Sequence, residues 1–275
     1  MKKLILALTA VAAFSGSALA ADLPVRTYSK APVMPEPIQN WTGFYLFGGF
    51  GFGLWEADTH TENFAGVCGV PGTLTTQDSL CVEQRQGGKG WYGTVGGGYD
   101  WQFNGRWVAG ILADGQFGNI RGTIQDQGPF AVGREDLKDT WAVGARLGYL
   151  VAPNVLSYVN GGYTGSSWSG TTLVDAHVGV PLGLHTNSFN STGWFIGGGV
   201  ENSFDFFGIN FPGLFMKTEY RWAQYGTHLI GELSDTTGLP AAGFNNISFH
   251  PQVQTVSTSL VYRFNWGGPP VAARY

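Results

Sequence analysis

Residues 41–55 read WTGFYLFGGFGFGLW, with a large apolar side chain at nearly every second position. One parity holds Phe44, Leu46, Phe50, Phe52 and Leu54, whereas the other holds mainly glycine. Alternate side chains of an extended strand point to opposite faces, so this pattern places an apolar stripe on one side. Glycine leaves the other side nearly bare, as a narrow and crowded interior requires. The stretch therefore predicts a strand that faces lipid outward.

The N-terminus has the pattern of a secretory signal peptide. Lys2 and Lys3 form a short basic region, residues 4–14 an apolar one, and residues 18–20 read Ala-Leu-Ala before a mature start at Ala21. The apolar run is shorter than the roughly 20 residues that a membrane-spanning helix needs. We predict that residues 1–20 are a cleaved signal peptide and that the protein is exported.

Composition narrows the class of protein further. Charged residues are 12% of the chain, about half the usual share, and 43 of 275 residues are glycine, more than twice the average. Loss of residues 1–20 removes two of the 15 basic residues, leaving 13 against 19 acidic ones and a formal charge of −6. This balance offers no basic surface for nucleic acid. No apolar run of 18 residues follows the signal peptide, so a secreted β-sandwich and a closed transmembrane barrel remain.

Seven further segments show the same alternation of apolar and small or polar residues. They are residues 91–103, 107–117, 141–149, 155–163, 194–204, 214–222 and 252–264. The register of 155–163 stays open because both parities carry apolar residues. Connections of about two to nine residues alternate with long ones at roughly 56–89, 121–139, 165–192 and 226–250. This alternation is typical of bacterial outer-membrane barrels. The sequence therefore predicts an all-β fold, an eight-stranded antiparallel transmembrane β-barrel over residues 41–264.

Several short motifs also carry a resemblance to a known family. They are ADLP at 21–24, the Pro-rich segment to Pro37, NWTGFY at 40–45, RLGY at 146–149, KTEYR at 217–221 and VYRF at 261–264. In this order and spacing they resemble the small alphaproteobacterial outer-membrane β-barrel proteins, often called outer-membrane immunogenic or porin-family proteins. The resemblance extends to about residue 266. It implies a barrel like the membrane domain of OmpA, located in the cell outer membrane of a Gram-negative bacterium.

The resemblance also implies how the chain is assembled. Insertion would use a C-terminal signal ending in an aromatic residue, here Tyr262 and Phe264, although residues 265–275 form a short extension and Tyr275 is the alternative end. The implied partners are outer-membrane lipids, the barrel-insertion machinery and periplasmic chaperones during assembly. In the third strand this chain has Leu112 where family members often carry an acidic residue.

Residues 21–40 contain Pro24, Pro32, Pro35 and Pro37 with little periodicity. This pattern predicts an extended periplasmic linker, with an arm that binds a partner or tethers peptidoglycan as the alternative.

Cys68 and Cys81 fall in the first long connection, bounded by glycine and proline. Exported chains meet oxidising conditions, so a disulfide that closes this loop is favoured. A metal pair or a catalytic thiol is the alternative, but the spacing is not a zinc pattern and His60 is the only histidine nearby.

Seven charged residues from five predicted strands share the inward parity. They are Asp114, Arg146, Glu201, Lys217, Glu219, Arg221 and Arg263. The interior of an eight-stranded barrel is just wide enough for side chains to fill it. We expect these groups to form a mutually neutralising ion network that plugs the lumen, because isolated buried charges are costly. A selective channel lined by the same groups is the alternative.

An enzymatic role has little support in the sequence. Asp175 and His177, with nearby serines, suggest a hydrolytic or lipid-modifying site at the barrel rim. However, no Gly-x-Ser-x-Gly motif is present, and glycine runs such as 96–98 lie inside strands rather than at a strand-to-helix turn. We predict no catalytic, cofactor or metal site, and a structural or surface-presentation role, with a narrow porin for small solutes as the alternative. The external loops could bind a ligand that the sequence does not identify.

Overall fold

The computed structural model describes residues 40–62, 83–126, 130–206, 209–240 and 246–264. Eight of the strands form a closed ring in the order β4-β3-β2-β1-β12-β9-β8-β5, in which β5 pairs back to β4. Their bounds are β1 Gly43–Glu62, β2 Gln84–Phe103, β3 Trp107–Asp126, β4 Ala131–Ala152, β5 Val155–Trp168, β8 Phe189–Phe206, β9 Ile209–Tyr225 and β12 Asn246–Phe264.

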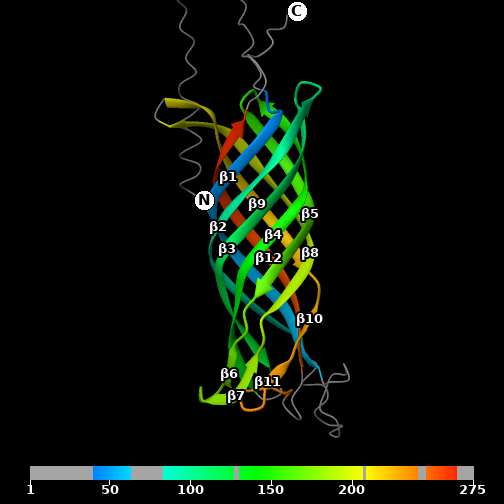
Figure 1. Cartoon of the computed structure of the whole chain (residues 1–275), viewed down its shortest axis with the longest axis vertical. Helices are drawn as coiled ribbons and strands as arrows, with labels where there is room; N and C mark the ends of the chain where they lie inside the picture. The colour runs from blue at the N-terminus through cyan, green and yellow to red at the C-terminus, as the bar shows by residue number, and fades with distance from the viewer. Residues whose placement is uncertain (1–39, 63–82, 127–129, 207–208, 241–245, 265–275) are drawn as a thin grey trace, which may run out of the picture. The chain divides into compact units, whose positions relative to one another are not determined.

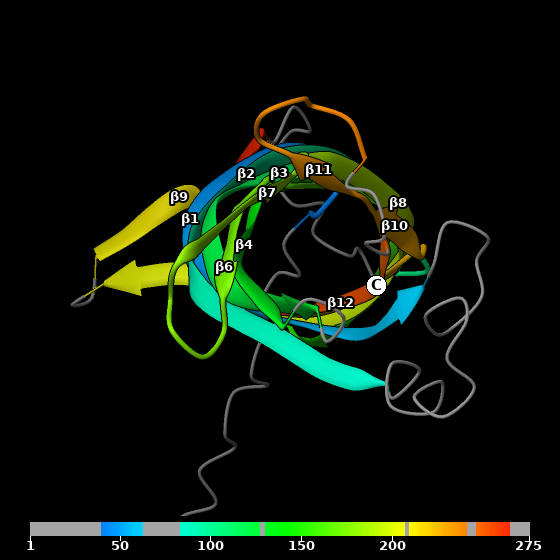
Figure 2. The same ribbon diagram turned by 90° about the horizontal axis from the view of Figure 1, so that it is seen from below.

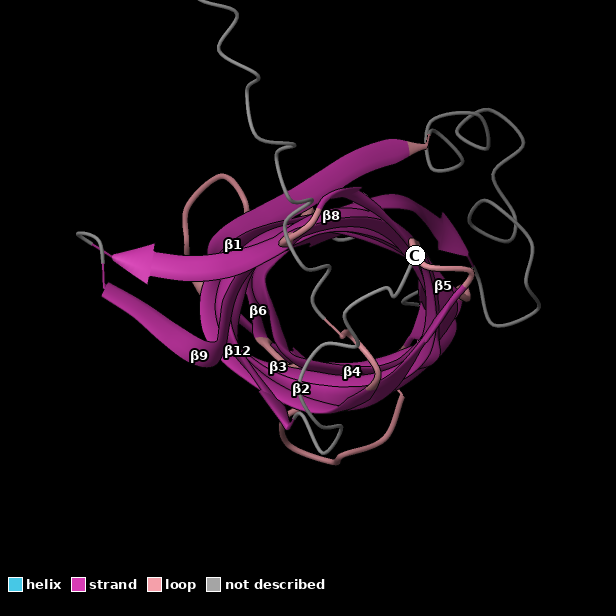
Figure 3. Ribbon diagram, turned by 90° about the horizontal axis from the view of Figure 1, so that it is seen from above, coloured by secondary structure: helices cyan, strands magenta, loops and turns pink. Residues whose placement is uncertain are grey.

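Every pairing in this ring is antiparallel. Figure 1 shows the strands tilted across the barrel wall, and Figures 2 and 3 show the ring from its two ends. A closed ring leaves no unpaired strand edge, which is what a strand in lipid requires. The predicted all-β, eight-stranded antiparallel barrel is confirmed.

Exposure follows the predicted parity along the strands. In β1, the side chains of Phe44 and Phe50 are 59% and 65% exposed, whereas Tyr45 between them is 2% exposed. In β5, the open register is resolved, because Leu156 and Tyr158 face inward and Val159 and Tyr163 outward. The outward residues form the apolar face that a lipid bilayer would cover.

The inward face of β1 differs from the expectation that it is nearly bare. Tyr45, Phe47 and Trp55 are buried there and fill the lumen. The glycines accommodate these rings and their neighbours: a Cβ on Gly51 would lie 2.6 Å from the hydroxyl of Tyr92. Small and large side chains thus share the interior, as close packing requires.

The strands also extend beyond the segments that the apolar alternation marked. The β3–β4 hairpin includes most of residues 121–139, which were expected to be a long connection. There the outward residues become polar while inward residues such as Ile124 stay buried. Alternation of apolar residues on the outward face therefore does not mark the parts of β3 and β4 that extend beyond the lipid.

The two ends of the barrel differ in their connections. The end at the top of Figure 1 has short turns and is called the short-turn end. In its β2–β3 turn, Asn104 (φ 47°) and Gly105 (φ 73°) adopt the left-handed backbone conformation that tight hairpin turns require. The other is called the long-loop end. There four short strands gather, β6 (Thr172–Asp175), β7 (Pro181–Thr186), β10 (His228–Ile230) and β11 (Glu232–Ser234).

Several predicted features lie outside the described residues. These are the signal peptide, residues 21–39 of the linker, Cys68, Cys81 and the extension 265–275. Their predictions stand unchanged.

Candidate functional site

All seven predicted lumen charges lie inside the barrel. Each is at most 8% exposed, and Glu201 is completely buried. Parity explains this placement, because each occupies an inward position of its strand. The contacts divide the seven into two groups, and the first group includes a residue that the predicted network lacked.

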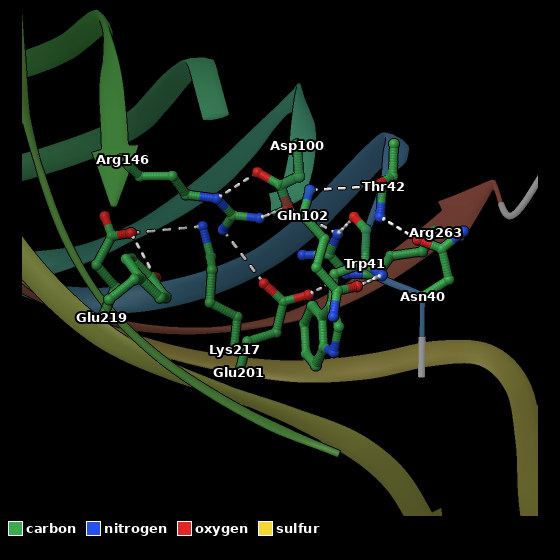
Figure 4. A network of polar contacts seen from close by, with 11 residues as sticks. Asn40, Trp41, Thr42, Asp100, Gln102, Arg146, Glu201, Lys217, Glu219 and Arg263 are labelled. Atoms are coloured by element: carbon green, nitrogen blue, oxygen red, sulfur yellow. Dashed lines mark hydrogen bonds and ion pairs between the residues drawn. The ribbon is translucent and has the colours of Figure 1, made fainter. Parts of the chain in front are cut away.

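The first group, here called the arginine ring, consists of Asp100, Arg146, Glu201 and Arg263 (Figure 4). Arg146 donates from Nε to Oδ1 of Asp100 at 2.8 Å, with a second ion pair between its Nη2 and Asp100 Oδ2, and from Nη1 to Oε2 of Glu201 at 3.2 Å. Arg263 donates from Nε to Oε1 of Glu201 and from Nη1 to Oδ2 of Asp100, both at 2.7 Å. Each arginine therefore contacts both carboxylates, and the four groups close a cycle.

The four residues of the arginine ring come from β2, β4, β8 and β12, which are every second strand of the barrel. Strand tilt brings alternate strands to the same height in a small barrel. Because of this spacing, the cycle extends across the lumen from all sides. Gly110 on β3 makes room for it, since a Cβ there would collide with the carboxylate of Asp100.

Aromatic side chains enclose the arginine ring toward the short-turn end. The guanidinium carbon of Arg263 lies 4.4 Å from the ring centre of Trp41, and that of Arg146 lies 4.3 Å from the ring centre of Tyr45. Arg263 also donates to the carbonyl oxygen of Trp41 at 3.2 Å, and the backbone N–H of Trp41 donates to Oε1 of Gln102 at 2.8 Å. Cation–π contacts of this kind strengthen where water is excluded.

The second group, here called the central cluster, consists of Asp114, Lys217, Glu219 and Arg221. Arg221 donates to both oxygens of Asp114, at 2.9 and 2.7 Å, and to Oε1 of Glu219 at 2.9 Å. Lys217 Nζ lies 3.7 Å from Oε2 of Glu219. The same Glu219 oxygen accepts hydrogen bonds from Tyr158 at 2.8 Å and Asn160 at 3.0 Å.

The central cluster also joins opposite walls. Asp114 is on β3 and Arg221 on β9, which are four strands apart in the ring of eight. Their paired hydrogen bonds therefore cross the lumen. With Asp100 included, the two groups contain four cations and four carboxylates.

Asp100 is the site residue that the predicted network lacked. It is fully buried and contacts both arginines of its ring. The sequence does contain a signal for Asp100. In the strand 91–103 it alternates with Tyr99 and Trp101, which face outward, so its parity places it on the inward face.

Aromatic residues fill the lumen toward the long-loop end, which the sequence did not predict. Trp55, Trp168, Phe189 and Phe249 form this outer aromatic cluster, with ring centres 5.1–6.0 Å apart in five pairs. All four are at most 8% exposed. Phe189 and Phe249 lie in segments that were expected to be long connections or their edges, so no lumen position was assigned to them.

Asp175 and His177, at the rim of the long-loop end, belong to a turn. Oδ1 of Asp175 accepts hydrogen bonds from the backbone N–H groups of His177 at 2.7 Å and Val178 at 3.0 Å. These bonds lower the pKa of Asp175. Among the described residues, no group of three or more His, Cys, Asp or Glu side chains is arranged to hold a metal ion.

The proposed insertion signal lies at the end of β12. Tyr262 and Phe264 share the outward face, with ring centres 4.9 Å apart. Phe264 pairs with Phe44 of β1, where the last strand closes the barrel. Their role in insertion remains a prediction.

Comparison with known proteins gives relatives by sequence. The chain is 29% identical over 270 residues to the 31 kDa outer-membrane immunogenic proteins of Brucella melitensis and Brucella suis, covering 96% of this chain and 100% of each relative. No family model matches the chain. In the described part, no helix is long and apolar enough to span a membrane.

Comparison with solved structures gives outer-membrane proteins of low sequence identity. OprG from Pseudomonas aeruginosa aligns at 10% identity with a TM-score of 0.49, covering 82% of this chain and all of OprG. The outer membrane protease OmpT from Escherichia coli aligns at 10% identity with a TM-score of 0.41, covering 81% of this chain and 97% of OmpT. The sequence relatives, together with the closed ring and its apolar outer face, identify the chain as an outer-membrane β-barrel protein related to the alphaproteobacterial outer-membrane immunogenic proteins.

Proposed function

We propose that this protein is a non-enzymatic barrel with a closed lumen, which serves envelope structure and presents its long loops at the cell surface. The main support for a closed lumen is the arginine ring, because its four side chains form hydrogen bonds with one another across the barrel. The central cluster and the outer aromatic cluster lie along the same lumen. A solute would have to break several buried ion pairs to pass.

Surface presentation is supported by the relatives and by the loops. The Brucella proteins are named immunogenic outer-membrane proteins. In this chain, Val178 and Leu239 in the long connections are 72% and 64% exposed.

Labelling of a Thr237→Cys variant in intact cells tests on which side of the membrane these loops lie. The variant is made with Cys68 and Cys81 replaced by serine, so that it has a single cysteine. A membrane-impermeant maleimide should react with whole cells. Labelling only after lysis would place these loops on the periplasmic side.

Outer-membrane lipids are the proposed partners of the apolar outer face, and the barrel-insertion machinery and periplasmic chaperones the proposed partners during assembly. The aromatic end of β12, Tyr262 and Phe264, supports recognition by that machinery. We propose no cofactor and no nucleic-acid partner.

A solute-efflux measurement on the refolded protein separates a closed barrel from a narrow porin. Lipid vesicles that contain the wild type should lose K⁺ and glucose about as slowly as vesicles without protein. A double variant, Asp100→Ala with Glu201→Ala, leaves two buried arginines that recruit water, so efflux should rise. Asp58→Ala with Glu56→Ala, at an exposed ion-pair site of Arg85, is the matched control. Fast efflux from wild-type vesicles would favour the porin.

A further inference from the structure

The exposed basic side chains near the long-loop end gather on three adjacent strands. Outside the lumen, every lysine and arginine of the described residues is exposed on β2, β3 or β4, except Arg106 in the β2–β3 turn. Figure 1 shows these three strands side by side. The residues are Arg85, Lys89, Arg121, Arg134 and Lys138. Because the chain as a whole has a formal charge of −4, this is a local concentration of cations.

Carboxylates neutralise the two cations that lie farthest from the apolar outer face. Arg85 pairs with Asp58 at 3.1 Å, and Arg134 donates to both oxygens of Asp136, at 3.0 and 2.9 Å. The other three, here called the basic row, are Lys89, Arg121 and Lys138. Asp136 faces Arg121 in the β3–β4 ladder, but no ion pair joins any member of the basic row to an acidic side chain of the described residues.

Strand pairing places the members of the basic row next to one another. Lys89 is directly opposite Arg121 in the β2–β3 ladder, and side chains that face each other in this way have Cβ atoms about 5 Å apart. Lys138 follows Leu137, the β4 partner of Ile120. Like charges at facing positions destabilise a sheet. An anion bound to the basic row would remove this repulsion.

The basic row lies next to a band of aromatic side chains on the outer face, on the side of the long loops. This band, here called the aromatic girdle, consists of Phe52, Trp91, Phe117, Trp141, Tyr163, Trp194 and Trp222. Rings in it contact one another, with centres 5.3 Å apart for Phe52 and Trp91. Aromatic girdles mark the level of the lipid headgroups on membrane barrels. Lys89 is two residues from Trp91, or roughly 7 Å along the strand, so the basic row lies at headgroup level.

We propose that the basic row binds the headgroup of an anionic, phosphate-bearing lipid in the leaflet at the long-loop end. The guanidinium of Arg121 can donate two parallel hydrogen bonds to phosphate oxygens, and the ammonium groups of Lys89 and Lys138 act as point charges. The acyl chains lie along the apolar outer face, beside Trp91 and Val95. This binding rests on the lipid contact proposed above for that face, and adds the class of lipid and the residues that select it.

A lipid fits this surface better than a soluble anion does. The basic row borders an apolar surface on which Trp91 and Phe117 are 68% and 59% exposed. A lipid covers the charges and the apolar side chains together, whereas a free phosphate ion would leave the apolar side chains uncovered. Basic residues next to an apolar membrane surface attract anionic headgroups in this way.

Electron paramagnetic resonance of spin-labelled lipids measures the preference with the full chain in phosphatidylcholine membranes. Lipids in contact with the protein give a motionally restricted signal, and its size for labelled phosphatidic acid and labelled phosphatidylcholine gives their relative association. We expect the wild type to prefer phosphatidic acid at least about fivefold, the factor that one basic residue near an anionic surface contributes. A chain with Lys89→Gln, Arg121→Gln and Lys138→Gln should bind the two labels equally.

The matched control removes the same number of exposed cations elsewhere. A chain with Arg85→Gln, Arg106→Gln and Arg134→Gln should keep the preference. A second control with Lys89→Arg and Lys138→Arg keeps the charge of the basic row and should also keep it. All of these positions are exposed, so each variant should fold.

Equal association of the two labels with the wild type would overturn the proposal, and so would an equal loss of preference in the basic-row variant and its matched control. A preference that added inorganic phosphate abolishes would show that the basic row binds the free ion and not the lipid. If labelled phosphatidylcholine gave no restricted signal at all, the lipid contact proposed for the outer face would fail, and the headgroup site with it.

Discussion

Asp100 is the carboxylate on which both cations of the arginine ring depend. It contacts Arg146 and Arg263, and all three side chains are at most 2% exposed. Asp100→Ala leaves two buried guanidinium groups with Glu201 alone, and removal of one partner from a buried ion pair typically costs about 3–5 kcal/mol. Urea titration in lipid vesicles should show a loss of this size in the free energy of unfolding.

Asp58→Ala is the control for this loss, because Asp58 pairs with Arg85 at the surface, where the two side chains are 47% and 65% exposed. Exposed pairs contribute about 0–1 kcal/mol. Equal losses in the two variants would show that the arginine ring does not hold the barrel together.

Glu135 on β4 gives the barrel a pH dependence of its own. Glu135 is fully buried, and neither of its carboxyl oxygens accepts a hydrogen bond from the described residues. Burial, and to a smaller extent the nearby charge of Asp136, raise the pKa of Glu135 to about 8. The positive charge of Lys138 lowers this pKa by a smaller amount. The folded protein therefore binds this proton more tightly than the unfolded chain does. Its contribution to stability is fully present below about pH 4.5 and is lost as the pH rises towards about 8.

Glu135→Gln should remove this dependence and make the protein more stable than the wild type at pH 9, by roughly 2–4 kcal/mol. Unfolding titrations of both proteins at pH 5 and pH 9 measure the difference. A wild-type curve that gains stability between these values would contradict the assignment to Glu135.

At the scale of the element, β9 has an outward and an inward face of opposite character. Tyr220 is 47% exposed, whereas Lys217 and Arg221 are 4% and 6% exposed. Met216 belongs to the outward face, so Met216→Arg should cost about 2–4 kcal/mol if it lies near the bilayer midplane. Lys217→Arg keeps the charge beside Glu219 and should cost less. The reverse ranking in refolding titrations would mean that the register of β9 is displaced by one residue.

We predict a disulfide in the first long connection. A disulfide between Cys68 and Cys81 closes a loop of about a dozen residues, which stabilises that loop by roughly 3 kcal/mol at most and the barrel hardly at all. Thiol labelling of the denatured, non-reduced mature protein should find no free cysteine. Two labelled thiols would rule out the bond.

The elements show how far sequence alone reaches. Alternation placed all eight barrel strands and the inward faces of β2, β3, β4, β8, β9 and β12, because the period of two follows from backbone geometry. It did not reveal that Asp100 joins Arg146 and Arg263, since parity assigns a face but not a partner on another strand. Nor did it predict β6, β7, β10 and β11 or the lumen positions of Phe189 and Phe249. The four short strands have only three to six residues each, too few for an alternation to show.

For the whole molecule, the lumen contains three successive layers. The arginine ring and Trp41 lie toward the short-turn end, the central cluster follows, and the outer aromatic cluster lies toward the long loops. The first two layers carry four positive and four negative groups, so neither sign dominates as it does in a selective pore. Buried ion pairs are weak evidence for stability but cost much to break singly. Closure of the lumen therefore depends on the whole network.

Single-channel recording of the refolded protein in a planar bilayer measures this closure. The wild type should conduct poorly, and Arg146→Ala should destabilise the barrel and raise the conductance, because Asp100 and Glu201 would each lose a cation and admit water. Arg85→Ala, at the exposed ion-pair site, should leave the conductance unchanged. A large and steady wild-type conductance that Arg146→Ala does not alter would contradict a closed barrel and show that the charges line an open path.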